Sequence, residues 1–148
     1  MSTTTTRGQT SAPPVADLWA SEKESAAYLA ANAIKEGVNT MASGLQYKII
    51  KTAKGLSPKL IDRVRVHYHG TLIDGTVIDS SILRGEPVTF PVNAVIQGWT
   101  QALQLMKVGE KWQLFIPPDL AYGKNGVQGV IGPNSTLIFN VELLGIEK

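Results

Sequence analysis

The sequence has 148 residues, of which 43% are hydrophobic and 18% charged, and its formal net charge is +2. This balance excludes a collagen-like rod, a coiled coil and wholesale disorder, and no run of like charges favours nucleic acid as a partner. The length suits one domain with an appendage, and the absence of cysteine removes disulfides, thiolate zinc sites and cysteine nucleophiles.

Residues 1–14 are rich in Ser and Thr and end in two prolines, so we predict a disordered tail there. The tail lacks the apolar stretch of a secretory signal, and no apolar segment of the chain approaches the ~20 residues that span a bilayer. These features predict a cytoplasmic protein with no membrane partner.

A helix is predicted over residues 15–36, which contain neither Gly nor Pro. Trp19, Ala26, Ala30 and Ala33 recur there at helical spacing before Gly37 provides a stop. The helix either projects from the body or lies across it, and a linker follows it to residue 43.

From residue 44 onward the apolar period changes from 3.6 to 2, which is typical of half-buried strands. Asp74-Gly75 lies between two apolar runs and predicts a tight hairpin, while apolar residues at helical spacing from Trp99 to Met106 predict one short helix facing the sheet. The predicted fold class is therefore α+β, with an antiparallel sheet of about five strands. Alternation places these strands at 45–50, 63–68 leading into the hairpin, 88–92, 111–116 and 136–144.

A loop of about twenty residues, rich in Gly and Pro, lies between Ile116 and Thr136, and loops of that length are usually functional or disordered. Tyr122 stands among its turn residues, where burial has no obvious structural need. We therefore predict that Tyr122 binds a ligand.

The sequence contains no nucleophile elbow, phosphate loop or zinc-protease motif, and only two histidines are present for acid-base chemistry. His67 and His69 share one face of a predicted strand, a spacing that could hold a metal. Arg65 shares that face and no carboxylate is near in sequence, which favours a solvated strand face over a metal site.

Seven short motifs follow one another through the β-region. They are VHYHG at 66–70, DG at 74–75, DSS at 79–81, VIQGW at 95–99, MKVGE at 106–110, IPPDLAYG at 116–123 and LIFNVELL at 137–144. In order, spacing and context they resemble the FKBP-type peptidyl-prolyl cis/trans isomerases over residues 44–148. The preceding residues 28–47 resemble the Mip-like branch, in which a helix precedes the isomerase domain.

This resemblance implies a twisted antiparallel sheet wrapped around one short helix, and an isomerase of X-Pro bonds that needs no cofactor or metal. The implied partners are proline-containing polypeptides and the macrolide inhibitors rapamycin and tacrolimus. A non-catalytic proline-binding or chaperone module remains the alternative. Mip-like proteins often dimerise through their N-terminal region, but a monomer is preferred here because only the last helix of that region is recognisable.

The resemblance also implies which residues form the site. Trp99 would be the floor under the proline ring, the Ile96 N–H and the Tyr122 hydroxyl would reach substrate carbonyls, and Asp79 would either act beside Tyr68 or cap the following turn. The implied catalytic residues are Tyr68, Asp79, Trp99, Tyr122 and Phe139, and the implied binding residues are Ile78, Phe90, Val95, Ile96 and Ile131.

Four positions depart from the commonest pattern of this family: Ile78, Val88, Val127 and Gly132. Ile78 stands where an aromatic side chain is usual. We therefore expect weaker macrolide binding than in relatives that carry an aromatic residue there.

Overall fold

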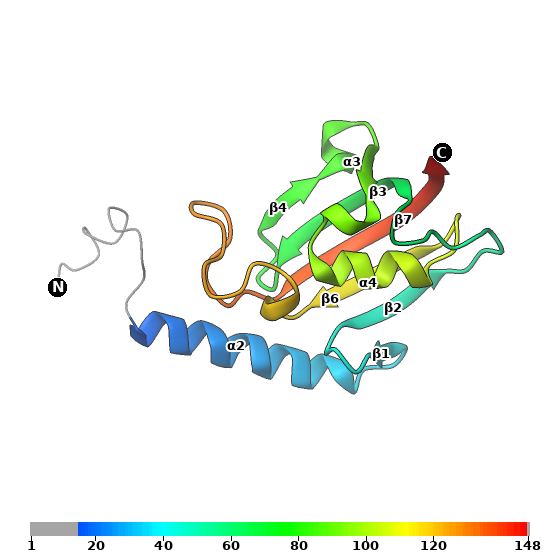
Figure 1. The fold of residues 1–148 in the computed structure, drawn as a ribbon. Coiled ribbons are helices and arrows are strands. Elements are labelled where there is room, and N and C mark those ends of the chain that lie inside the picture. Colours follow the sequence, from blue (N-terminus) through cyan, green and yellow to red (C-terminus); the bar gives the residue numbers. More distant parts are fainter. Residues whose placement is uncertain (1–14, 148) are drawn as a thin grey trace.

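The structure is a computed structural model that describes residues 15–147, with side chains from residue 21 onward. The predicted disordered tail at 1–14 lies outside the described residues. The elements are shown in Figure 1 and are, in chain order, α2 (Val15–Ala33), β1 (Val38–Thr40), β2 (Gln46–Lys51), β3 (Arg63–Leu72), β4 (Val77–Ser80), α3 (Ser81–Arg84), β5 (Val88–Pro91), the 3-10 turn η1 (Val92–Ala94), α4 (Gln97–Leu105), β6 (Lys111–Ile116), the 3-10 turn η2 (Pro118–Leu120) and β7 (Leu137–Glu147).

Within the described residues, seven strands form one antiparallel sheet in the order β1-β2-β6-β7-β3-β4, and β5 pairs with β3 beside that path. The α+β class is confirmed, but the sheet has more than the expected five or so strands. The second arm of the predicted hairpin is a strand in its own right, β4. The other addition, β1, has only three residues, Val38–Thr40, and is recognisable only by its pairing with β2.

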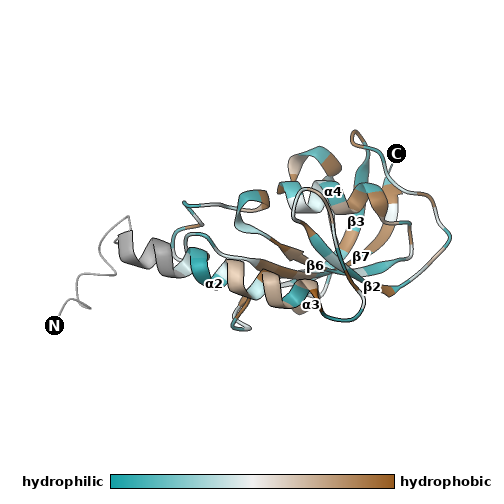
Figure 2. Cartoon of the chain, turned by 90° about the horizontal axis from the view of Figure 1, so that it is seen from below, coloured by the Kyte–Doolittle hydropathy of each residue, from teal (hydrophilic) through white to brown (hydrophobic). Residues whose placement is uncertain are grey.

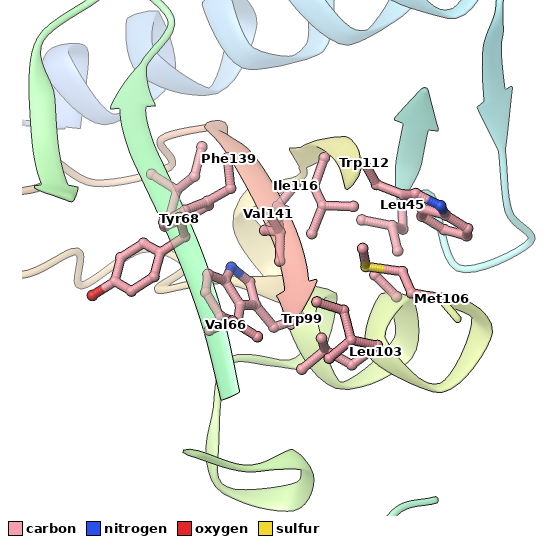
Figure 3. Packing of buried hydrophobic residues seen from close by; sticks show 14 of the residues in the cluster. Leu45, Val66, Tyr68, Trp99, Leu103, Met106, Trp112, Ile116, Phe139 and Val141 are labelled. Carbon is pink, nitrogen blue, oxygen red and sulfur yellow. The ribbon is translucent and has the colours of Figure 1, made fainter. Parts of the chain in front are cut away.

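The helix α4 lies on one face of the sheet, as its apolar spacing predicted. Trp99, Ala102, Leu103 and Met106 are all buried and pack against the inward-facing side chains of the strands (Figure 3). The helix approaches β6 closely at Gly98, where an added Cβ would lie 2.6 Å from Cγ2 of Ile116. The last strand contributes the predicted alternating row of buried residues, which is Leu137, Phe139, Val141 and Leu143.

The buried carboxylate of Glu110 joins β6 to the turn that precedes it and to the segment that follows β2. Glu110 is 6% exposed, and its oxygens accept hydrogen bonds from the Ala53 N–H at 3.3 Å, the Lys107 N–H at 3.2 Å and the Trp112 indole N–H at 3.0 Å. Because all three donors need this single acceptor group, Glu110 has a structural role.

Residues 21–33 of the N-terminal helix α2 lie along one side of the body (Figures 1 and 2). Its Asn32 Nδ2 donates to Gln46 Oε1 at 2.7 Å, and Gln46 Nε2 donates back to the Leu29 carbonyl at 2.9 Å. Two helical turns before Asn32, Ser25 Oγ donates to the Asn134 carbonyl at 2.5 Å, which ties α2 to the loop before β7. The helix ends at Ala33, three residues before the predicted end, because the chain turns to pair β1 with β2. None of the helices in the described part of the chain is both long and apolar enough to cross a bilayer.

Candidate active site

A cavity of about 440 Å³ opens between the sheet, the start of α4 and the loop after η2. Each of its walls comes from a different element, so only the folded domain assembles it. It is lined by Tyr68 of β3, Asp79 of β4, Phe90 of β5, Ala94, Val95 and Ile96 before α4, Trp99 of α4, Tyr122 of the long loop and Phe139 of β7.

Three aromatic rings surround Trp99 and meet its indole edge to face. The ring centroids of Tyr68 and Phe139 lie 5.2 Å from that of Trp99, at interplanar angles of 82° and 89°, and the ring of Phe90 lies 5.7 Å away at 86°. Edge-to-face pairs at these distances are favourable, so each ring helps to hold the others in place. Trp99 is 4% exposed, which agrees with its predicted place at the floor.

The indole N–H of Trp99 is buried and has no hydrogen-bond partner within the described residues. An unpaired buried donor costs about 1–3 kcal/mol, and native structures seldom keep one without a reason. No acceptor of the described residues therefore reaches the indole N–H at the floor of the cavity.

The phenol of Tyr68 is held by two charged partners at the mouth of the cavity. Tyr68 Oη donates to Asp79 Oδ2 at 2.6 Å, and Arg84 Nη2 donates to Tyr68 Oη at 2.9 Å. Arg84 also binds Asp79 directly through an ion pair. The carboxylate therefore orients Tyr68 while its own charge is balanced.

These contacts shift two pKa values. Burial, followed by the hydrogen bond to Asp79, raises the pKa of Tyr68, so the phenol stays protonated. Burial alone would raise the pKa of Asp79, but the hydrogen bonds from Tyr68 and Arg84 and the charge of Arg84 outweigh it and lower that pKa. Asp79 is therefore ionised at neutral pH, and it is the only charged residue among the described residues that line the cavity.

The capping role that was the alternative for Asp79 belongs to its neighbour. Ser80 is the N-cap of α3, and its Oγ accepts a hydrogen bond from the Leu83 N–H at 3.1 Å. The two histidines that were considered for a metal also contact this region: His67 Nδ1 lies 2.6 Å from Ser81 Oγ, and His69 Nδ1 lies 2.8 Å from Ser80 Oγ. Both half-buried imidazoles thus contact buried serine hydroxyls.

The loop after β6 is built from successive turns. Ala121 and Gly123 both donate backbone hydrogen bonds to the Pro118 carbonyl, and a short bridge joins Val127 to Ile131. These turns hold Tyr122 at the cavity with 42% of its surface exposed. Tyr122 thus lies on the cavity wall, and its predicted contact with a ligand stays a prediction.

Two of the expected site residues do not line the cavity. Ile78 is half-buried and packs against the core from the side, and Ile131 is 8% exposed within the core. Neither residue is on the cavity wall, so the structure gives no support to their predicted binding roles. Conversely, sequence analysis missed Ala94, a small residue with no distinguishing pattern, and Arg84. The only signal for Arg84 was its cationic side chain five positions after Asp79.

The lining suits binding rather than covalent chemistry. It offers aromatic and aliphatic walls, two phenol groups and one carboxylate, and the described lining residues include no Ser, Cys, His or Lys nucleophile. Such a cavity can enclose a small apolar ring and exclude water from it.

Two family models match the chain. Residues 54–144 match the model described as FKBP-type peptidyl-prolyl cis-trans isomerase, and residues 9–49 match the model of the domain amino terminal to such isomerases. The first match contains every residue of the cavity, and the second contains α2, β1 and most of β2.

Known relatives show the same similarity. The chain is 59% identical over 123 residues to the FKBP-type 22 kDa peptidyl-prolyl cis-trans isomerase of Escherichia coli strain K12, covering 83% of this chain and 60% of the relative. It is 53% identical over 126 residues to the peptidyl-prolyl cis-trans isomerase Mip of Coxiella burnetii, covering 85% and 55%. The chain thus spans between half and two thirds of the length of these relatives. The crystal structure of FkpA from Escherichia coli superposes with a TM-score of 0.85 at 47% identity, covering 88% of this chain and 61% of FkpA.

Proposed function

This chain belongs to the FKBP-type peptidyl-prolyl cis-trans isomerase family, with a Mip-like N-terminal helix, and we propose that it accelerates rotation about X-Pro bonds in polypeptides. The proposed role is to assist the folding of protein substrates. The supporting observation is the cavity whose aromatic walls meet Trp99 edge to face.

Rotation about an X-Pro bond must overcome amide resonance, a barrier of about 18–20 kcal/mol that makes the uncatalysed exchange take tens to hundreds of seconds. A site lowers this barrier by binding the twisted amide better than either planar form, and each ~1.4 kcal/mol of that preference gives a tenfold gain. The twisted amide has less charge separation than the planar one. An apolar cavity that excludes water therefore favours it.

The proposed roles follow from the positions of the side chains. The proline ring rests on Trp99 between the walls formed by Tyr68 and Phe139, and the Tyr122 hydroxyl donates to a substrate carbonyl. The backbone N–H of Ile96 makes no hydrogen bond within the described residues, so it is free to donate to a second carbonyl. Asp79 positions Tyr68.

A comparison of two buried tryptophans tests the proposal. We expect the wild-type chain to accelerate cis-trans exchange of a short prolyl peptide, measured by exchange spectroscopy or by a protease-coupled assay. Trp99→Leu should abolish that acceleration. The matched control is Trp112→Leu, since Trp112 is also buried but stacks on Tyr47 at 4.4 Å, away from the cavity. Both variants should lose stability, and only Trp99→Leu should lose activity in the folded fraction.

The outcome separates enzyme from binding module. If the folded wild-type chain binds the peptide without accelerating its exchange, the non-catalytic alternative replaces the proposal. If it does neither, the cavity is not a proline site.

We also propose that rapamycin and tacrolimus bind at this cavity, because its aromatic walls suit an apolar ring of such a ligand. Quenching of tryptophan fluorescence on titration with either compound measures the binding. Inhibition of peptide isomerisation should follow the same curve. The expected weakening by Ile78 is tested by Ile78→Phe, which should tighten binding, although Ile78 lies beside the cavity rather than on its wall.

A monomer and a cytoplasmic location remain proposals. The face of α2 that carries Ser25 and Asn32 is occupied by contacts with its own domain, which supports the monomer. Light scattering at two concentrations and cell fractionation, respectively, would test them.

A further inference from the structure

The loop between η2 and β7, orange in Figure 1, connects the cavity to the N-terminal helix α2. Near its start Tyr122 lines the cavity, and near its end the Asn134 carbonyl accepts the hydrogen bond from Ser25 Oγ of α2 at 2.5 Å. Ser25 is buried, so this contact is largely shielded from solvent. One loop therefore touches both the helix and the candidate active site.

The two ends of the loop are joined through their backbones. The Asn134 N–H donates to the Gly123 carbonyl at 2.8 Å, and Gly123 directly follows Tyr122 in the chain. On the other side, the Tyr122 carbonyl accepts from the Gly126 N–H at 3.1 Å. Asn134 is thus one hydrogen bond away from the residue next to Tyr122.

The backbone of Asn134 has an unusual conformation that serves both contacts. Its φ is 53°, and within the described residues no other residue except glycine has a positive φ. This left-handed region costs a non-glycine residue about 1–3 kcal/mol, although asparagine tolerates it better than most, and such residues persist where their surroundings hold them. Two of the contacts that hold Asn134 are Gly123 on the side of the cavity and Ser25 on the side of α2.

The Tyr122 side chain depends on its own backbone for its direction. It is exposed and is not packed into the hydrophobic core, and its hydroxyl makes no hydrogen bond with another described residue. A functional side chain is held precisely only when packing or hydrogen bonds lock it in place. A shift of the backbone at Gly123 would therefore be passed on to the hydroxyl that we assign to a substrate carbonyl.

From these contacts we propose that Ser25 is a positioning residue of the site. Its hydroxyl fixes Asn134, and Asn134 fixes, through Gly123, the backbone that directs the Tyr122 hydroxyl to the substrate. The inference rests on the proposed function of the cavity and on the role of Tyr122 in it. Helix α2 is then part of the catalytic unit, although none of its described residues lines the cavity.

A double-mutant cycle tests the positioning role. Ser25→Ala removes the hydroxyl with little change in volume, and kcat/KM for a short prolyl peptide should fall by about three- to tenfold, the range expected for one neutral hydrogen bond. In a Tyr122→Phe chain, which lacks the hydroxyl that Ser25 positions, Ser25→Ala should cause no further fall. A merely structural role would lower kcat/KM by the same factor in both chains.

The matched control is Asn32→Ala. Asn32 anchors the same helix to β2 through Gln46 Oε1 at 2.7 Å, and this hydrogen bond does not involve the loop. The variant should lower Tm and leave kcat/KM of the folded fraction unchanged. The proposal is overturned if Ser25→Ala keeps the wild-type kcat/KM, if it is equally harmful in both backgrounds, or if Asn32→Ala lowers kcat/KM as much.

Amide hydrogen exchange separates these outcomes from failure of the proposed function. Exchange of the Asn134 N–H, followed by NMR, reports on the loop without any substrate. Ser25→Ala should make this exchange several-fold faster, and Asn32→Ala should leave it unchanged. Equal rates in wild type and Ser25→Ala would overturn the inference even if the peptide is accelerated, whereas a wild-type chain that does not accelerate the peptide refutes the proposed function, whatever the exchange rate.

Discussion

The wall formed by Phe139 depends on the absence of a side chain at Gly70. A Cβ at Gly70 would lie 2.3 Å from Cε1, 2.7 Å from Cδ1 and 2.8 Å from Cζ of Phe139. Since ordinary contacts begin near 3.4 Å, the ring would have to retreat by about 1.1 Å. That movement would break its packing against Trp99.

The expected cost of Gly70→Ala follows from this overlap. Overpacking a well-packed core costs about 1–3 kcal/mol, which for a domain of this size corresponds to a fall in Tm of about 3–10 °C. Because the displaced ring is a cavity wall, kcat/KM for a prolyl peptide should also fall, by about tenfold or more. Thermal unfolding followed by circular dichroism and peptide exchange at about 10 °C, where the uncatalysed reaction takes minutes, measure the two effects.

A second glycine in the sheet provides the control. Gly145 pairs with Arg65 across β3 and β7, and a Cβ there would meet nothing within 4 Å. Gly145→Ala should therefore leave activity unchanged and leave stability equal or slightly higher, since alanine restricts the unfolded chain. If Gly70→Ala resembles Gly145→Ala in both Tm and kcat/KM, the reasoning about Phe139 is refuted.

Three further substitutions probe the site and its support. Asp79→Asn should reduce kcat/KM several-fold and lower Tm slightly at pH 7. Because the folded-state pKa of Asp79 is lowered, its ionised form adds stability above about pH 4, and this contribution is lost as pH falls further, so the Tm curves of wild type and variant should converge on acidification. Parallel Tm curves from pH 7 to 2 would contradict that assignment. Tyr122→Phe should lower kcat/KM and leave Tm unchanged, because 42% of the tyrosine's surface is exposed and only its hydroxyl is removed; full activity would dismiss the hydroxyl as a donor. Glu110→Ala removes the acceptor of one buried and two part-buried N–H donors. It should cost about 3 kcal/mol in urea unfolding without changing the activity of the folded fraction, and a cost below about 1 kcal/mol would show that water replaces the carboxylate.

The sequence was informative wherever a repeating pattern decided the local structure. Apolar alternation placed β6 at residues 111–116 and the buried row of β7, and the spacing from Trp99 to Met106 placed α4 on the sheet. These elements are long enough for their period to be read, and each buries one face. The motif order then supplied the family and most of the cavity wall.

Tertiary structure decided the features that show no hydrophobic period in the sequence. The strand β1 has three residues and α3 only four, so neither is long enough to show a hydrophobic repeat. The strand β1 forms because β2 pairs with it, and α3 forms because Ser80 caps it. The partner of Asp79 was equally hidden, because Arg84 reaches the carboxylate only when α3 folds back over β3.

The same distinction holds at the level of single side chains. The family resemblance implied that Ile78 and Ile131 belong to the site, but a resemblance specifies which residues are close and not which atoms face the cavity. The direction of a side chain depends on the packing of all its neighbours, as the overlap of Phe139 with Gly70 illustrates. The sequence by itself determined the class of fold and the chemistry of the walls, and the tertiary packing decided which walls enclose the cavity and which charge balances Asp79.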